Sequence, residues 1–88
     1  MRVTTVTARA SGDGWICEVT IEEPRGNSEH TVEVSRAEFE QYASGRSVEE
    51  LVAASFDFLL EREPPGAILR RFRLRQIQDY FPEFGSQI

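Results

Sequence analysis

The side chains best suited to nucleophilic catalysis in this chain are its single cysteine, Cys17, and its single histidine, His30. A nucleophilic thiol needs a base within hydrogen-bonding reach. The strand pairing derived below places both residues on one face of a sheet, but Val19 and Val32 separate them. We therefore expect a small buried cysteine and a histidine at the edge of the core. We predict that the protein is not an enzyme.

The same residues limit metal and nucleotide chemistry. A single cysteine cannot form an internal disulfide or a thiolate metal cluster, and His30 has no partner at a ligand spacing. A Walker-type GK[ST] motif is impossible because the chain contains no lysine. Gly12 and Gly14 lack the GxGxxG spacing and a following helix. We therefore expect no metal and no cofactor.

Four glutamates of the expected strands could act as paired acids and bases. The pairing places Glu18 opposite Glu33 and Glu22 opposite Glu29, and carboxylates held close together raise the pKa of one partner. On an exposed sheet, salt screens this repulsion, so we interpret the four residues as a solvated acidic face. The alternative is a basic partner docking there, including the arginines of a second copy.

A basic cluster lies near the end of the sequence, where residues 68–78 contain four arginines and no acidic residue. Arginines on a helix can contact phosphates and base edges, and three C-terminal helices would leave room for a helix-turn-helix. Apolar residues interleave with these arginines, however, and the net charge of −5 would repel a duplex. A nucleic-acid-binding regulator is therefore the alternative hypothesis. The arginines are Arg70, Arg71, Arg73 and Arg75.

Two phenylalanines after this cluster complete the candidate binding surface. Phe81 and Phe84 either cap the core or leave an apolar patch for a partner. The main hypothesis is a non-enzymatic protein-interaction or regulatory module, whose partner is an unknown protein and which could also associate weakly with itself. Its predicted binding residues are Arg70, Arg71, Arg73, Arg75, Phe81 and Phe84.

Two turn signals, at residues 11–14 and 24–27, divide the first 35 residues into three extended segments. A four-residue loop at each turn predicts an antiparallel meander with one apolar and one polar face. The predicted opposite pairs are Val6 with Val19, Ala8 with Cys17, Ala10 with Trp15, Val19 with Val32, Cys17 with Val34, and Glu22 with Glu29. The apolar face then holds Val6, Ala8, Cys17, Val19, Ile21, Val32 and Val34, with Trp15 and His30 at its ends.

Capping boxes mark the starts of two helices, at residues 35–38 and 47–50. In each, a serine hydroxyl and a glutamate three residues later satisfy each other's free backbone amides. The first box predicts a short helix that ends at Gly45. The second predicts a helix over about residues 48–62 whose apolar residues cover most of its circumference. We expect this second helix to be the central buried element.

The last stretch of the chain is ambiguous. Its apolar residues fit two helical turns that are out of phase, so we favour two short helices or one bent helix. The competing interpretation makes residues 70–75 a strand in which Phe72 and Leu74 alternate with arginines. Pro82 ends the helix in either case.

The C-terminal half also carries a recognisable pattern. Residues 58–64 read Phe-Leu-Leu-Glu-Arg-Glu-Pro, and residues 80–82 read Tyr-Phe-Pro. Over residues 46–84 this pattern resembles a family of small, uncharacterised bacterial proteins. The resemblance implies a bacterial origin, and it brings no established activity, ligand or catalytic residue.

At 88 residues the chain has room for one domain. Strands followed by helices predict an α+β fold, in which a three-stranded antiparallel β-meander is followed by three or four α-helices packed on one face. We expect the sheet over residues 1–35, the helical layer over 36–84 and a tail over 85–88. The lone cysteine, the absence of a signal-peptide pattern and the shortness of the longest apolar stretch predict a cytoplasmic protein that does not contact a membrane.

Overall fold

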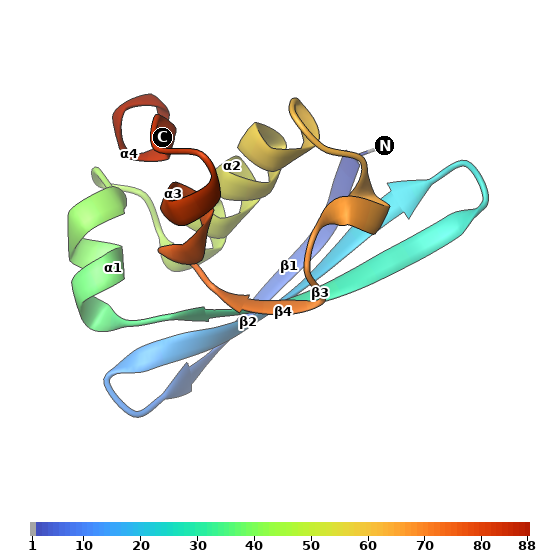
Figure 1. Ribbon diagram of the computed structural model, residues 1–88. Helices are drawn as coiled ribbons and strands as arrows, with labels where there is room; N and C mark the ends of the chain where they lie inside the picture. Colours follow the sequence, from blue (N-terminus) through green and yellow to red (C-terminus); the bar gives the residue numbers. More distant parts are fainter. Residues whose placement is uncertain (1) are drawn as a thin grey trace.

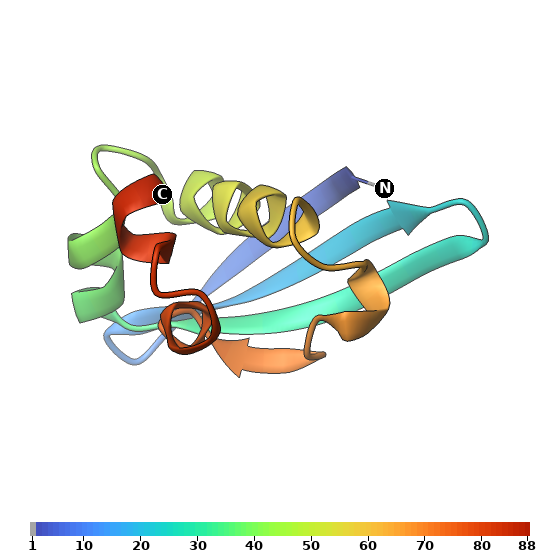
Figure 2. The ribbon, with the colours of Figure 1, turned by 45° about the horizontal axis from the view of Figure 1, so that its top comes forward.

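The computed structural model describes residues 2–88 and confirms the α+β class, with helices packed against a sheet (Figures 1 and 2). The sheet has four strands in the order β1-β2-β3-β4. In chain order the elements are β1 (Arg2–Ser11), β2 (Gly14–Glu23), β3 (Gly26–Val34), α1 (Arg36–Tyr42), α2 (Val48–Leu60), the 3-10 turn η1 (Pro65–Ala67), β4 (Arg71–Arg73), α3 (Gln76–Tyr80) and α4 (Phe84–Gln87).

The first hairpin, β1 with β2, has the predicted register. Ala8 is opposite Cys17 and Ala10 is opposite Trp15, as the loop length required. Gly12 has a φ of 57° in the turn, a left-handed conformation that glycine adopts without steric cost. The predicted pair of Val6 with Val19 is also confirmed.

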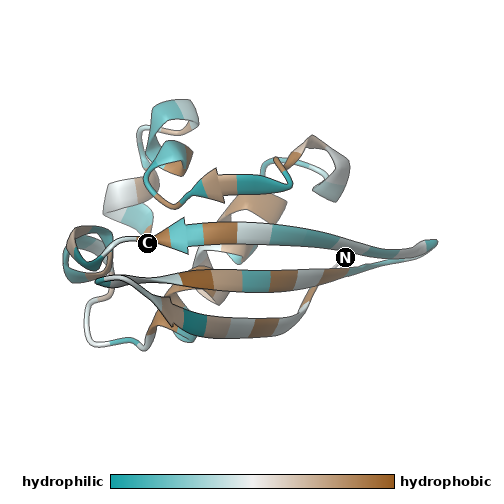
Figure 3. Cartoon of the chain, turned by 90° about the horizontal axis from the view of Figure 1, so that it is seen from below, coloured by the Kyte–Doolittle hydropathy of each residue, from teal (hydrophilic) through white to brown (hydrophobic). Residues whose placement is uncertain are grey.

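The second hairpin, β2 with β3, is tighter than predicted. Pairing continues to Glu23 opposite Gly26, and the φ of 136° at Gly26 lets the chain reverse over only two residues. Because the error is two residues and side chains alternate with a period of two, the apolar face is the predicted one. Figure 3 shows the alternation of apolar and polar residues along the strands. The pairs that prove wrong are Val19 with Val32, Cys17 with Val34, and Glu22 with Glu29.

The tighter turn also separates the glutamates of the polar face. Glu18 lies opposite Thr31, whose hydroxyl donates to Glu18 Oε2 over 3.1 Å. Glu33 lies opposite Ile16, and its carboxylate faces Arg71 Nε at 3.4 Å. The predicted pairing of Glu18 with Glu33 is therefore wrong, and the two carboxylates do not form a coupled acid–base pair.

A fourth strand, β4, joins the sheet in parallel to β3, with Thr31 opposite Arg71. The Thr31 amide donates to the Arg70 carbonyl over 2.7 Å, and the Leu74 amide donates to the Glu33 carbonyl over 3.0 Å. The favoured helical interpretation is wrong for residues 71–73, and the competing strand interpretation is correct there. The open edge of β3 accepts the segment because its alternating pattern buries every second side chain.

Both capping boxes are present in the helices that they predicted. The Ser35 hydroxyl accepts from the Glu38 amide at the start of α1, and the Ser47 hydroxyl accepts from the Glu50 amide at the start of α2. Helix α2 runs along the apolar face of the sheet (Figure 2). Its buried residues are Val48, Leu51, Val52, Ser55, Phe56, Phe58 and Leu59, so it is the central element as predicted.

The C-terminal segment closes the core. Helix α3 stops two residues before Pro82, as predicted, whereas residues predicted as a tail form the short helix α4. The Phe84 ring is fully buried, with its centroid 5.1 Å from that of Tyr42 and 5.3 Å from that of Phe58. Within residues 2–88, no helix is both long enough and apolar enough to span a membrane.

Candidate functional site

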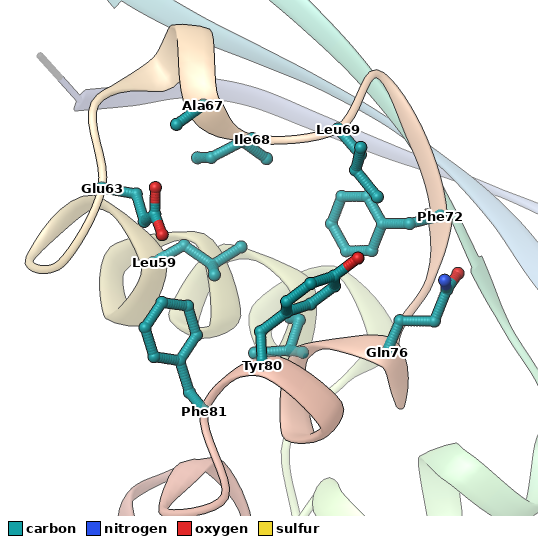
Figure 4. Close-up of a pocket in the computed structure, with 10 residues that line it drawn as sticks. Leu59, Glu63, Ala67, Ile68, Leu69, Phe72, Gln76, Tyr80 and Phe81 are labelled. Carbon is teal, nitrogen blue, oxygen red and sulfur yellow. The ribbon is translucent and has the colours of Figure 1, made fainter.

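An apolar groove lies between the C-terminal end of α2, η1, β4 and α3 (Figure 4). Its volume is about 190 Å³. The residues that line it are Leu59, Glu63, Ala67, Ile68, Leu69, Phe72, Gln76, Ile77, Tyr80 and Phe81. We call this feature the Leu69–Tyr80 groove.

Two residues of the groove are large, hydrophobic and exposed. Leu69 is 49% exposed and Tyr80 is 68% exposed, although most apolar residues around them are buried. Figure 4 shows the Tyr80 ring extending from α3 toward Leu69 and Phe72. Exposed apolar side chains that gather at one groove mark an interaction site more strongly than scattered ones.

His30 holds one wall of the groove in place. Its ring is 2% exposed and packs against Phe56, with the ring centroids 5.5 Å apart. His30 Nδ1 lies 2.8 Å from the Leu69 carbonyl oxygen, and Nε2 lies 3.1 Å from the Ser28 hydroxyl. Because a carbonyl can only accept, Nδ1 carries a proton and donates to the Leu69 carbonyl. The histidine thus fixes the backbone that presents Leu69.

Side-chain contacts also position the opposite wall. The Gln76 side chain accepts from the Arg73 amide over 2.7 Å, which links the start of α3 to β4. Phe81 is partly buried, and its ring meets the Phe58 ring edge-on with centroids 6.0 Å apart. These contacts fix α3 at both ends and so set the position of Tyr80.

The structure does not bring the predicted binding residues together on one surface. Arg71 and Arg73 alternate with the buried Phe72, so their side chains lie on the other side of β4 from the groove. Arg70 is exposed beside Leu69. Arg75 and Arg73 line a separate hollow that also contains Trp15.

The two phenylalanines predicted to bind a partner differ in their position in the structure. Phe81 lines the groove, and its role in partner binding stays a prediction. Phe84 is fully buried, so its prediction as a binding residue is wrong and the core-capping alternative is correct. The sequence reasoning missed Leu69 and Tyr80, because exposure of these apolar residues depends on how β4 and α3 pack.

Cys17 and His30 are not arranged as nucleophile and base. Cys17 is fully buried and lies opposite Val32, whereas His30 lies opposite Val19. Burial raises the pKa of the Cys17 thiol to about 11, and the charges of Glu49 and Glu18 add to the shift. A thiol with this pKa is protonated at neutral pH and is a weak nucleophile.

Among residues 2–88, no group of three or more histidine, cysteine, aspartate or glutamate side chains is arranged to hold a metal ion. The comparisons with known proteins identify no relative on which a family resemblance could be tested. No protein-family model, no curated protein and no solved structure matches this chain.

Proposed function

We propose that this protein is a non-enzymatic interaction module that binds a partner protein through the Leu69–Tyr80 groove. The observation that carries the proposal is that Leu69 and Tyr80, the two large exposed hydrophobic residues within positions 2–88, line the same apolar groove. Tyrosines at such sites frequently dominate binding energy, since one ring supplies a large apolar area and a hydroxyl. The lone buried cysteine suits a reducing compartment, and we infer that the module acts in the cytoplasm.

The size of the groove supports a side-chain anchor as its occupant. Small-molecule sites enclose roughly 300–1,000 Å³, and this groove, at about 190 Å³, is smaller. One or two apolar side chains of a partner are a better match than a cofactor. The charges near the groove add a further requirement, because the Glu63 carboxylate belongs to its lining and the exposed Arg70 follows Leu69 in sequence. The proposed ligand is therefore a protein segment with an apolar anchor flanked by charged residues of both signs, a basic one near Glu63 and an acidic one near Arg70.

A site-specific crosslink tests the proposal. A photoreactive phenylalanine analogue at position 80 would capture the partner in cells, and mass spectrometry would identify it. The purified partner should then bind Tyr80→Ala at least about thirty-fold more weakly than wild type, which corresponds to roughly 2 kcal/mol. Leu69→Ser should weaken binding as well. Thr7→Ala, on the exposed face of β1, is the matched control and should bind normally.

Each contrary result has a clear meaning. Equal affinity of wild type and Tyr80→Ala for the purified partner would place the interface elsewhere and refute the groove. Capture of a second copy of this chain would identify the partner as the protein itself. Binding of nucleic acid that falls steeply with added salt, and that depends on Arg70 and Arg71, would favour the alternative of a nucleic-acid-binding regulator.

A further inference from the structure

The β1–β2 turn and the start of α1 lie at the same end of the sheet (Figure 1). A second hollow is lined there by residues of this turn, the start of α1, the end of β4 and the turn that follows it. Its volume is about 410 Å³. Three arginines and the single tryptophan of the chain contribute to its lining: Arg36, Arg73, Arg75 and Trp15. We call this feature the arginine hollow.

The three arginines come from different parts of the chain. Arg36 begins α1, Arg73 ends β4, and Arg75 follows in the turn before α3. All three are exposed, and none forms an ion pair within the described residues 2–88. The Arg36 guanidinium carbon lies 5.8 Å from the centre of the Trp15 ring. Three arginines therefore line one hollow, and none of them forms an ion pair within the described residues.

Two of the three carboxylates in the lining of the hollow already have hydrogen-bond or ion-pair partners. Glu33 faces Arg71 at 3.4 Å. Glu38 accepts from the Ser35 amide through Oε1 and from the Arg75 amide through Oε2, each over 2.7 Å. Asp13, in the β1–β2 turn, is the remaining carboxylate of the lining. The lining thus holds three arginines that have no ion pair, Asp13, and the Glu38 carboxylate, which keeps its charge but whose two oxygens are already occupied by backbone amides.

Backbone contacts hold the walls of the hollow. A Cβ atom on Gly14 would lie 2.2 Å from the Val34 carbonyl oxygen, so the β1–β2 turn packs directly against the end of β3. The bond between Glu38 and the Arg75 amide ties α1 to the segment after β4. A site built on such contacts is largely formed before its ligand arrives, which lowers the entropic cost of binding.

We propose that the arginine hollow binds small organic phosphates. Guanidinium groups present planar pairs of N–H donors that match phosphate oxygens, and several around one anion reinforce each other. The volume of the hollow falls within the range of small-molecule sites. It therefore has room for an organic group beside the phosphate, and Trp15 is the aromatic residue of its lining. This site is separate from the Leu69–Tyr80 groove and does not depend on the function proposed for it.

Trp15 makes the proposal directly measurable, because the chain has one tryptophan and therefore one indole N–H signal. The purified protein would be titrated with phenyl phosphate, inorganic phosphate and phenol at constant ionic strength, and the indole signal followed by ¹H–¹⁵N NMR. We expect a saturable shift with phenyl phosphate, weaker binding of inorganic phosphate and no saturable shift with phenol. Absence of a saturable shift with phenyl phosphate would overturn the proposal.

Charge variants show whether the arginines are responsible. Arg73→Gln and Arg75→Gln should each weaken phenyl phosphate binding by about tenfold, because each removes a charge-assisted contact. Both keep the Arg75 backbone amide that Glu38 requires. Asp13→Asn should strengthen binding by removing the remaining carboxylate. Arg25→Gln removes the same charge in the β2–β3 turn, at the opposite end of the sheet, and should change nothing.

Two comparisons complete the test. If Arg25→Gln weakens binding as much as Arg73→Gln, only the overall charge matters and the site is refuted. Unfolding midpoints of all variants confirm that the fold is intact. A phosphotyrosine peptide that binds more tightly than phenyl phosphate would identify the source of the phosphate as a protein, and equal affinity would favour a free metabolite. Tyr80→Ala should leave phosphate binding unchanged, which separates this site from the groove.

Discussion

Glu38 shows how one residue can serve two elements. Its amide donates to Ser35, and its carboxylate accepts from the amides of Ser35 and Arg75, while only 7% of the residue is exposed. The two bonds between Ser35 and Glu38 form a local capping box, which the sequence motif predicted. The bond to Arg75 crosses 37 positions of the chain, so no local pattern could indicate it.

Replacement of Glu38 should therefore cost more than the loss of a capping box. We expect Glu38→Ala to lower the free energy of unfolding by about 2–4 kcal/mol, because it leaves two backbone amides without their charged acceptor. Urea unfolding followed by circular dichroism measures the change. Glu50→Ala is the matched control, since Glu50 occupies the same position in the exposed box of α2. Equal losses in the two variants would mean that the Arg75 bond contributes nothing.

The buried thiol of Cys17 predicts a loss of stability at high pH. Its pKa in the folded protein is about 11, whereas an unfolded thiol ionises at about pH 8.5. The neutral thiol favours the folded state fully below that value, and this contribution disappears as the pH rises toward 11. Wild type should therefore lose more stability than Cys17→Ala between about pH 9 and 11 in urea unfolding. Parallel pH profiles would contradict the prediction.

At the level of elements, α2 connects the sheet to the C-terminal helices. Phe58 shows this connection, because its ring contacts Phe81 and Phe84 and lies 3.7 Å beneath the Arg62 guanidinium carbon. Arg62 also faces Glu83 at 3.4 Å and donates to Gln87 over 2.9 Å. The end of α2 thus holds α4 through both apolar and polar contacts.

Removal of the Phe58 ring should weaken this connection severely. We expect Phe58→Ala to lower the free energy of unfolding by about 3–5 kcal/mol, as for other buried phenylalanines, because the residue is only 6% exposed. Tyr80→Ala is the control and should change stability by less than about 0.5 kcal/mol. Urea unfolding of both variants measures the difference. A loss below about 1 kcal/mol for Phe58→Ala would contradict the central position of α2.

For the molecule as a whole, the helices cover one face of the sheet (Figure 2) and leave the other face, which is mostly polar, uncovered. The C-terminal segment completes this single core, because Phe84 is fully buried beside Tyr42 and Phe58. Arg46 of the α1–α2 loop also donates to the Ile88 carbonyl. Residues at the end of the sequence are therefore part of the folded structure rather than a tail.

Deletion of residues 84–88 should consequently destabilise the entire fold. We expect a loss of at least about 3 kcal/mol, which is a large share of the roughly 5–15 kcal/mol typical of small domains. Urea unfolding with two probes, near-UV and far-UV circular dichroism, would show a single shifted transition. Deletion of 85–88 alone keeps the Phe84 ring and should cost less. An unchanged midpoint after deletion of 84–88 would show that this segment is not part of the core.

Local signals were sufficient for the first hairpin, the apolar face of the meander and the starts of α1 and α2. Each depends on neighbours in sequence: a turn, an alternation of period two, or a serine and a glutamate three residues apart. The two-residue turn before Gly26 was missed because Pro24-Arg25 permits more than one loop length. The prediction of the apolar face remained correct only because the register shift was an even number of residues.

Tertiary contacts decided the C-terminal third and both candidate sites. The segment around Phe72 has a pattern that fits a strand or an irregular helix, and the open edge of β3 selects the strand by supplying backbone hydrogen bonds. That choice turns Arg71 and Arg73 away from the Leu69–Tyr80 groove and exposes Leu69 itself. Exposure, unlike capping or alternation, depends on contacts between residues that are distant in sequence. The backbone at Leu69, for example, is held by His30, which lies 39 positions earlier in the chain.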